Sequence, residues 1–77
     1  MKNDTELLLL QAAKLVELGY VVENERAALK HLVESGVPTS DPRVRQAYNR
    51  FVLADTEWKQ LEIEHLQLRK KLQVTDE

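Results

Sequence analysis

Side chains that could support nucleophilic catalysis occur in one short stretch of the chain. Ser35 and Ser40 are its only serines, and His31 precedes Ser35 by about one helical turn. Nucleophilic catalysis needs an activated side chain with a base beside it. Serines also cap helices and form turns, and this cluster arises readily at a capped helix end. We interpret both serines in that way, and we expect no catalytic residues and no enzymatic activity.

Metal binding and paired-carboxylate chemistry would need other clusters. A metal site requires ligands that converge on one point, but the chain has no cysteine and only two histidines, His31 and His65. In a helical hairpin their levels along the axis would differ by about 28 Å. Glu62 and Glu64 would point about 200° apart on a helix. We therefore expect no metal, no cofactor and no small-molecule substrate, and we interpret His65 as a register-setting or pH-sensitive residue of a helical seam.

Arg43, Arg45 and Arg50 could contact nucleic acid, with residues 42–53 as a recognition helix in the major groove. The charge balance argues against this function, because eleven basic residues face thirteen acidic ones and the net charge is −2. Nucleic-acid binders usually carry a basic excess. A small helical transcriptional or nucleic-acid-binding regulator is therefore our alternative function, and otherwise the arginines form the solvated rim of an interface.

The central punctuation of the chain predicts a tight connection between two helices. Gly36 suits the left-handed position just after a helix, and Pro38 prevents the helix from restarting at once. Asp41 then fits an N-cap, with Pro42 at the first helical position. We predict an all-α antiparallel hairpin over residues 1–77, with helices at about 5–35 and 42–73, a turn at 36–41, and pairing into a four-helix bundle by itself or with a partner.

The second helix carries a regular heptad pattern. Apolar residues recur with alternating spacings of three and four over about four heptads, with no Gly or Pro from 43 to 73. Such a pattern is typical of a helix that packs along one seam. The predicted seam residues are Val44, Ala47, Phe51, Ala54, Trp58, Leu61, His65, Leu68 and Leu72.

The first helix is apolar on more sides than one neighbour covers. Twelve of residues 7–22 are hydrophobic, and a helix of this kind is usually buried by several neighbours. We therefore expect a protein partner, a homodimer or both. We expect one face to comprise Leu8, Ala12, Leu15, Val22, Leu29 and Val33. The predicted partner-binding residues are Leu8, Leu9, Leu15, Val16, Tyr20, Val22 and Tyr48.

Gly19 leaves two possibilities open for this helix. It could lie inside one continuous helix, at a cost of about 1 kcal/mol relative to alanine. Alternatively it could end a first helix, with Asn24 capping a second one. In an antiparallel hairpin Gly19 would face Trp58, and a residue without a side chain opposite the bulkiest one favours the continuous helix.

The remaining composition bears on the compartment. No stretch is long and apolar enough for a transmembrane helix, and Asp4 and Glu6 stand where a signal peptide would be positive. The absence of cysteine fits a reducing compartment. We expect a cytoplasmic protein without membrane insertion.

Three resemblances accompany these patterns. The Gly36-Val37-Pro38 turn and the alanines of the second helix, Ala47 and Ala54, resemble the small helical-hairpin co-chaperones of type III secretion needle subunits. That resemblance implies a bacterial chaperone that holds a needle subunit until export.

The stretch Asp41-Pro42-Arg43-Val44 also resembles two other families, the helical hairpins that dephosphorylate sporulation response regulators and the helical regulators of competence and biofilm formation. The signature Ser-Gln-Glu-Leu-Asp of the first family would fall on residues 48–52, which lack its serine and aspartate.

Overall fold

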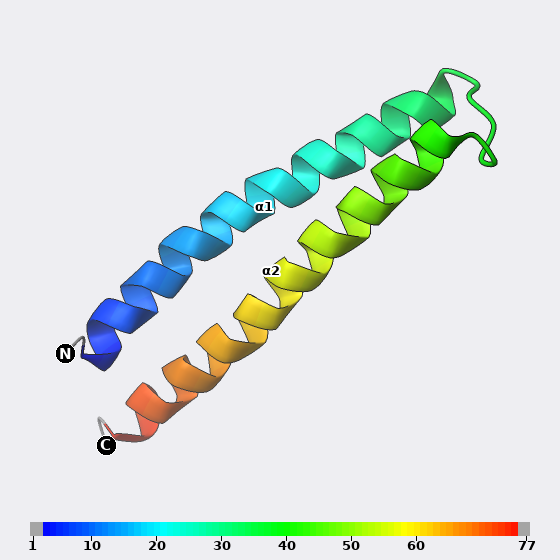
Figure 1. Ribbon diagram of the computed structural model, residues 1–77. Helices are drawn as coiled ribbons and strands as arrows, with labels where there is room; N and C mark the ends of the chain where they lie inside the picture. The colour runs from blue at the N-terminus through cyan, green and yellow to red at the C-terminus, as the bar shows by residue number, and fades with distance from the viewer. Residues whose placement is uncertain (1–2, 76–77) are drawn as a thin grey trace.

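Two long helices lie side by side and antiparallel, joined by one short turn (Figure 1). The computed structural model describes residues 3–75, with α1 at Asp4–Glu34 and α2 at Pro42–Thr75 and no strand among these residues. The predicted all-α antiparallel hairpin is confirmed, with helix bounds within two residues of those expected. Residues 1–2 and 76–77 of the predicted domain lie outside the described residues. The pairing into a four-helix bundle stays a prediction.

The end of α1 is a left-handed cap of the predicted kind. Gly36 has φ 86°, Val37 N–H donates to the Leu32 carbonyl at 3.1 Å, and Gly36 N–H donates to the Val33 carbonyl at 3.1 Å. These two bonds form the Schellman motif, which satisfies carbonyls that the end of a helix leaves unpaired. The Ser35 hydroxyl also donates to the His31 carbonyl at 2.7 Å. The helix therefore stops here because its last carbonyls find partners within the turn.

Asp41 starts α2 in the way the sequence predicts. Its Oδ1 accepts the Arg43 backbone N–H at 2.8 Å, and Pro42 occupies the first helical position. The Arg43 guanidinium also donates to both carboxylate oxygens, at 3.2 and 3.1 Å. This side-chain hydrogen bonding lowers the pKa of Asp41 below its ordinary value and raises that of Arg43.

The seam between the helices confirms the heptad prediction for α2 and corrects the one for α1. All nine predicted α2 positions are buried or half-buried. On α1 the residues Ala12 and Val33 are exposed instead of lying in the seam, while Gln11 and Glu25 lie in it. The α1 positions that turn toward α2 are Leu8, Gln11, Leu15, Leu18, Val22, Glu25, Leu29 and Leu32.

The polar residues of the seam have partners across it. Gln11 Oε1 lies 3.1 Å from His65 Nδ1, and Glu25 accepts a hydrogen bond from Arg50 Nε at 3.1 Å. The half-buried pair of Gln11 and His65 fixes the register of the two helices, because a shift would leave both groups unpaired, whereas water can solvate the exposed pair of Glu25 and Arg50. The position of His65 agrees with its predicted register-setting role.

Gly19 lies inside the continuous helix α1, so the predicted alternative of a break is wrong. A Cβ on Gly19 would lie 3.6 Å from Trp58 Nε1. The same indole N–H donates to the Leu15 backbone carbonyl at 3.1 Å. A methyl group would therefore be in ordinary van der Waals contact with the indole, and only a side chain longer than that of alanine would compete with it for the space beside this carbonyl.

Candidate protein-interaction surface

A continuous apolar feature outside the seam runs along α1. Leu9, Ala13, Val16 and Tyr20 are all exposed and recur at spacings of four, three and four. On a helix these positions fall within an arc of about 60°, centred about 150° from the seam. We call these four residues the outer stripe. Their exposed fractions reach 66% for Leu9, 59% for Val16 and 69% for Tyr20, so nothing in residues 3–75 covers them.

The partner-binding residues predicted from sequence divide into two groups. Leu9, Val16 and Tyr20 belong to the outer stripe, and Tyr48 is also exposed. Val22 does not belong to an accessible surface, because it is only 6% exposed and packs against α2 within the hairpin. Leu8 and Leu15 are half-buried in the seam and offer a partner only part of their surface.

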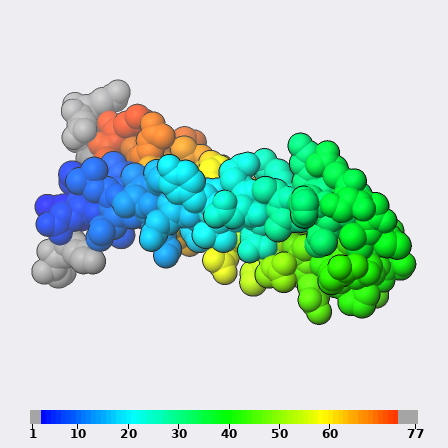
Figure 2. All heavy atoms as spheres, turned by 90° about the horizontal axis from the view of Figure 1, so that it is seen from above, coloured from blue at the N-terminus to red at the C-terminus, as the bar shows by residue number. Residues whose placement is uncertain are grey.

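The two long sides of the hairpin are lined by different residues. On one side Gly19, Glu23 and Arg26 of α1 lie beside Asp55 and Trp58 of α2. On the opposite side the neighbours are Val21, Glu25, Arg50, Leu53 and Glu57. Leu9 and Val16 precede Glu23 by multiples of seven residues, so they share its side of α1. Figure 2 shows α1, blue to cyan, lying in front along the length of the rod with its outer surface uncovered.

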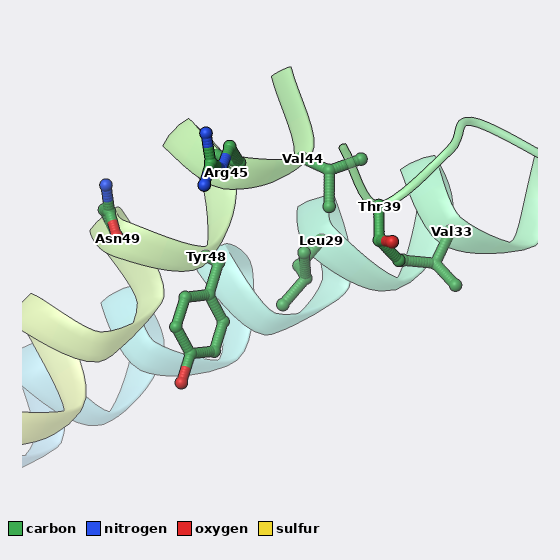
Figure 3. A pocket seen from close by; sticks show the side chains of 7 residues that line it. All are labelled: Leu29, Val33, Thr39, Val44, Arg45, Tyr48 and Asn49. Carbon is green, nitrogen blue, oxygen red and sulfur yellow. The ribbon is translucent and has the colours of Figure 1, made fainter. Parts of the chain in front are cut away.

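A shallow groove lies at the turn end of the hairpin (Figure 3). Its volume is about 610 Å³, and Tyr48 of α2 flanks it opposite Leu29 and Val33 of α1. Tyr48 and Val33 are both exposed large apolar residues. We call this feature the turn groove. Its lining residues are Leu29, Val33, Thr39, Val44, Arg45, Tyr48 and Asn49.

The three arginines of the alternative function are largely engaged within the chain. Arg43 forms an ion pair with Asp41 and Arg50 forms one with Glu25, both at 3.1 Å. Arg45 forms no ion pair with another residue of 3–75. Two of the three positive charges are therefore compensated before any phosphate approaches.

The candidates for catalysis and metal binding do not converge. The Ser35 hydroxyl is bonded to the backbone carbonyl of His31 and not to its imidazole. His65 contacts Gln11 in the seam, toward the open end of the hairpin. Within residues 3–75 no group of three or more His, Asp or Glu side chains is arranged to hold a metal ion.

The hairpin is too thin to enclose a core. It measures 55 × 19 × 16 Å with a radius of gyration of 17.1 Å, whereas a compact chain of this length has about 11.5 Å. Among residues 3–73 the buried side chains are only Val22, Val44, Ala47 and Ala54. The chain exposes 6100 Å², against about 4800 Å² for a compact protein of its mass. The excess of about 1300 Å² is surface that a further layer of helices could cover.

Comparison of the chain with protein-family models, with curated proteins and with solved structures found no match. In the part of the chain that the structure describes, neither helix has a window apolar enough to span a lipid bilayer.

Proposed function

We propose that this chain is a non-enzymatic protein-interaction module, a co-chaperone or adaptor, that binds a partner through the apolar face of its hairpin. The observation that carries the proposal is the outer stripe, which leaves Leu9, Val16 and Tyr20 in contact with water. Apolar residues arranged in a continuous patch of this kind usually mark an interaction site. Each Leu or Val that becomes fully buried contributes roughly 1.5–3 kcal/mol.

The position of Tyr48 supports a second contact region in the same function. Tyr48 flanks the turn groove with Leu29 and Val33 on its other wall. Tyrosine is among the residues that dominate binding energy when a partner buries them. A helix or loop of a partner protein that inserts an apolar residue into the turn groove would bury this ring.

The finer part of the proposal is a chaperone role in the bacterial cytoplasm. It is supported by the resemblance of the Gly36-Val37-Pro38 turn and of Ala47 and Ala54 to the co-chaperones of needle subunits, and by the lack of cysteine. A chaperone of this type would hold an aggregation-prone helical subunit by offering apolar helix surface in place of the subunit's own partners.

Affinity capture with matched variants tests the proposal. A tagged chain is incubated with an extract of the cells that produce it, and retained proteins are quantified for wild type, Leu9→Glu, Tyr48→Glu and Leu53→Glu. Leu53 is 63% exposed but lies on the opposite side of the hairpin, so it is the control. We expect wild type and Leu53→Glu to retain the same partner and at least one other variant to lose it. Equal retention by all four proteins would refute the proposal.

A salt titration separates this function from nucleic-acid binding. Phosphate contacts give an affinity that falls steeply with salt concentration. Because Arg43 and Arg50 already hold carboxylates, we expect no measurable binding of random duplex at physiological salt. Binding with a steep salt dependence, lost in Arg45→Ala, would instead favour the nucleic-acid-binding regulator.

A further inference from the structure

A second stripe of exposed positions runs along α2, on the side that faces away from the seam. Its nine positions alternate spacings of four and three residues from 45 to 73, and every one of them is exposed. They form one stripe about 42 Å long, centred about 150° from the seam. Three of the nine are basic, three are large apolar residues and none is acidic. We call this stripe the α2 row, and its residues are Arg45, Asn49, Val52, Thr56, Lys59, Ile63, Leu66, Lys70 and Gln73.

The acidic residues of α2 lie elsewhere on the helix. Asp55 and Glu62 lie about 70° to one side of the seam. Glu57 and Glu64 lie about 90° to its other side. These four are the only acidic residues of α2, so no carboxylate projects from the row itself. A solvated helix face usually carries both signs of charge, whereas the α2 row is a basic and apolar surface on a chain whose net charge is −2.

Two cations of the row and one beside it are available to a partner. Lys59 is already held at 2.8 Å by a carboxylate of α2. Arg45, Arg69 and Lys70, in contrast, form no ion pair within residues 3–73. Their charges therefore stay available to carboxylates of another molecule.

These cations lie beside exposed apolar side chains. Toward the open end of the hairpin, Ile63 and Leu66 line a shallow groove of about 410 Å³ together with Arg69 and Lys70. Ile63 is 52% exposed and Leu66 is 47% exposed, and none of the residues that line this groove is acidic. At the other end of the row, Arg45 lines the turn groove. Both ends therefore offer an apolar surface bordered by positive charge.

The residues between these ends favour a protein helix as the occupant. Asn49 and Thr56 would lose their hydrogen bonds with water inside a lipid layer, and Val52 would gain nothing from the phosphates of a nucleic acid. A helix of another protein can bury the apolar side chains and also bond the amide and hydroxyl groups. Spacings of four and three are those at which two helices pack along a common seam. The lack of acidic residues favours carboxylates on that helix, because they would meet only cations and neutral groups.

We propose that the α2 row binds an acidic amphipathic helix of another protein. The apolar side chains of this helix pack on Ile63 and Leu66. Its carboxylates lie beside Arg45 at one end of the row and beside Arg69 and Lys70 at the other. This inference rests on the proposed function, which it deepens by naming the chemistry of a partner and a contact surface on α2.

Selection from a peptide library tests the charge of the partner. The library displays helical peptides with fixed apolar a and d positions and a random choice of Glu, Lys and Gln at the flanking positions, and it is selected on the immobilised protein. We expect the selected peptides to be rich in Glu and poor in Lys, because like charges opposite the row repel. Enrichment of Lys, or no change in charge on selection, would overturn the proposal.

Substitutions in the row then locate the contact. The Kd of a selected acidic peptide is measured for wild type, Lys70→Glu, Ile63→Gln and Lys30→Glu. We expect Lys70→Glu and Ile63→Gln each to weaken binding at least about tenfold, since one replaces attraction by repulsion and the other removes an apolar contact. Lys30→Glu is the matched control, because it changes the net charge equally at an exposed position of α1. An equal loss in Lys70→Glu and Lys30→Glu would mean an unspecific effect of charge and would overturn the proposal.

Two other anionic partners are outcomes of the same titration. Vesicles of phosphatidylserine and phosphatidylcholine and random duplex DNA are titrated against wild type and Lys70→Glu at physiological salt. Tighter binding of either than of the peptide, lost in Lys70→Glu, would assign the row to that partner and overturn the proposal. If no acidic peptide binds while capture from the extract still depends on Leu9 or Tyr48, this inference fails and the proposed function stands.

Discussion

Replacing Gly19 with alanine should stabilise the hairpin, although Gly19 faces the largest side chain in the chain. A Cβ at this position would lie 3.6 Å from Trp58 Nε1, which is an ordinary van der Waals contact. The backbone at Gly19 is helical and has no positive φ. The added methyl group therefore fits. Alanine also restricts the unfolded chain, which loses the extra conformational freedom that glycine gives it.

The expected gain follows from the difference between glycine and alanine in a helix interior, about 0.5–1 kcal/mol in the free energy of unfolding. For a domain of this size 1 kcal/mol raises the thermal midpoint by about 4–8 °C. The matched control is Gly36→Ala. Gly36 has φ 86° with no atom within 4 Å of the added Cβ, so only backbone strain acts there. That strain costs alanine about 1–2 kcal/mol.

Thermal unfolding followed by circular dichroism at one fixed protein concentration compares the two variants with wild type. We expect Gly19→Ala to unfold at a higher temperature and Gly36→Ala at a lower one. Trp58 fluorescence reports whether the indole keeps its place beside α1. A destabilised Gly19→Ala would show that the indole needs bare backbone at this site and would refute our account of the packing. A neutral Gly36→Ala would refute the left-handed cap.

Three further substitutions test individual contacts. The lowered pKa of Asp41 means that its carboxylate adds stability above the ordinary value of 3.8, which is lost as the pH falls through the lowered value. Lowering the pH should therefore destabilise wild type more than Asp41→Asn in acid unfolding. Equal dependence of stability on pH in the two proteins would contradict the Arg43 contact. Gln11→Leu should lower the free energy of unfolding by about 1–2 kcal/mol because His65 loses its partner. The double variant Gln11→Leu/His65→Leu should have a higher free energy of unfolding than wild type. Urea unfolding of both variants measures this difference, and a fully tolerated single substitution would contradict the pairing. Trp58→Phe should cost about 1 kcal/mol through the lost hydrogen bond to α1, and unchanged urea unfolding would contradict that bond.

The turn and the second helix were predictable because local chemistry determines them. Gly36 and Asp41 act through bonds within a few residues, so their roles follow from residue type and order. The heptad pattern of α2 was equally predictable, because polar residues occupy the positions between its seam residues and so mark the side that faces solvent. Apolar residues, Trp58 among them, recur at the spacing that one packed face requires.

The seam of α1 was harder to predict because this helix is apolar on several sides. Hydrophobicity alone does not distinguish Ala12, which is exposed, from Gln11, which lies in the seam. Gln11 and Glu25 occupy seam positions because His65 and Arg50 bind them from α2, and such pairs depend on the register of two helices. Carrying the heptad pattern of α2 through the turn with Gly19 opposite Trp58 gives Ala12 and Arg26, each one residue beyond the observed Gln11 and Glu25.

The accessible surface was predicted in part for the same reason. The sequence indicates Leu9, Val16 and Tyr20 by their apolar character, and they are exposed because α2 packs against the other side of α1. Val22 is equally apolar, but it lies a multiple of seven residues from Leu8 and Leu15 and therefore in the seam. The side of the helix, and not the type of residue, separates an internal contact from an available one.

The response of the thermal midpoint to a selected acidic peptide without tryptophan, followed by Trp58 fluorescence, tests most directly whether the α2 row is a binding surface. A partner that binds only the folded state stabilises it, so the midpoint rises with the concentration of the partner. We predict a rise for wild type and for Lys30→Glu over about a hundredfold range of peptide concentration, and a rise that begins at about tenfold higher concentration for Lys70→Glu. If the midpoint of wild type stayed constant over that range, or if Lys70→Glu behaved like wild type, the result would contradict binding of an acidic helix at the α2 row.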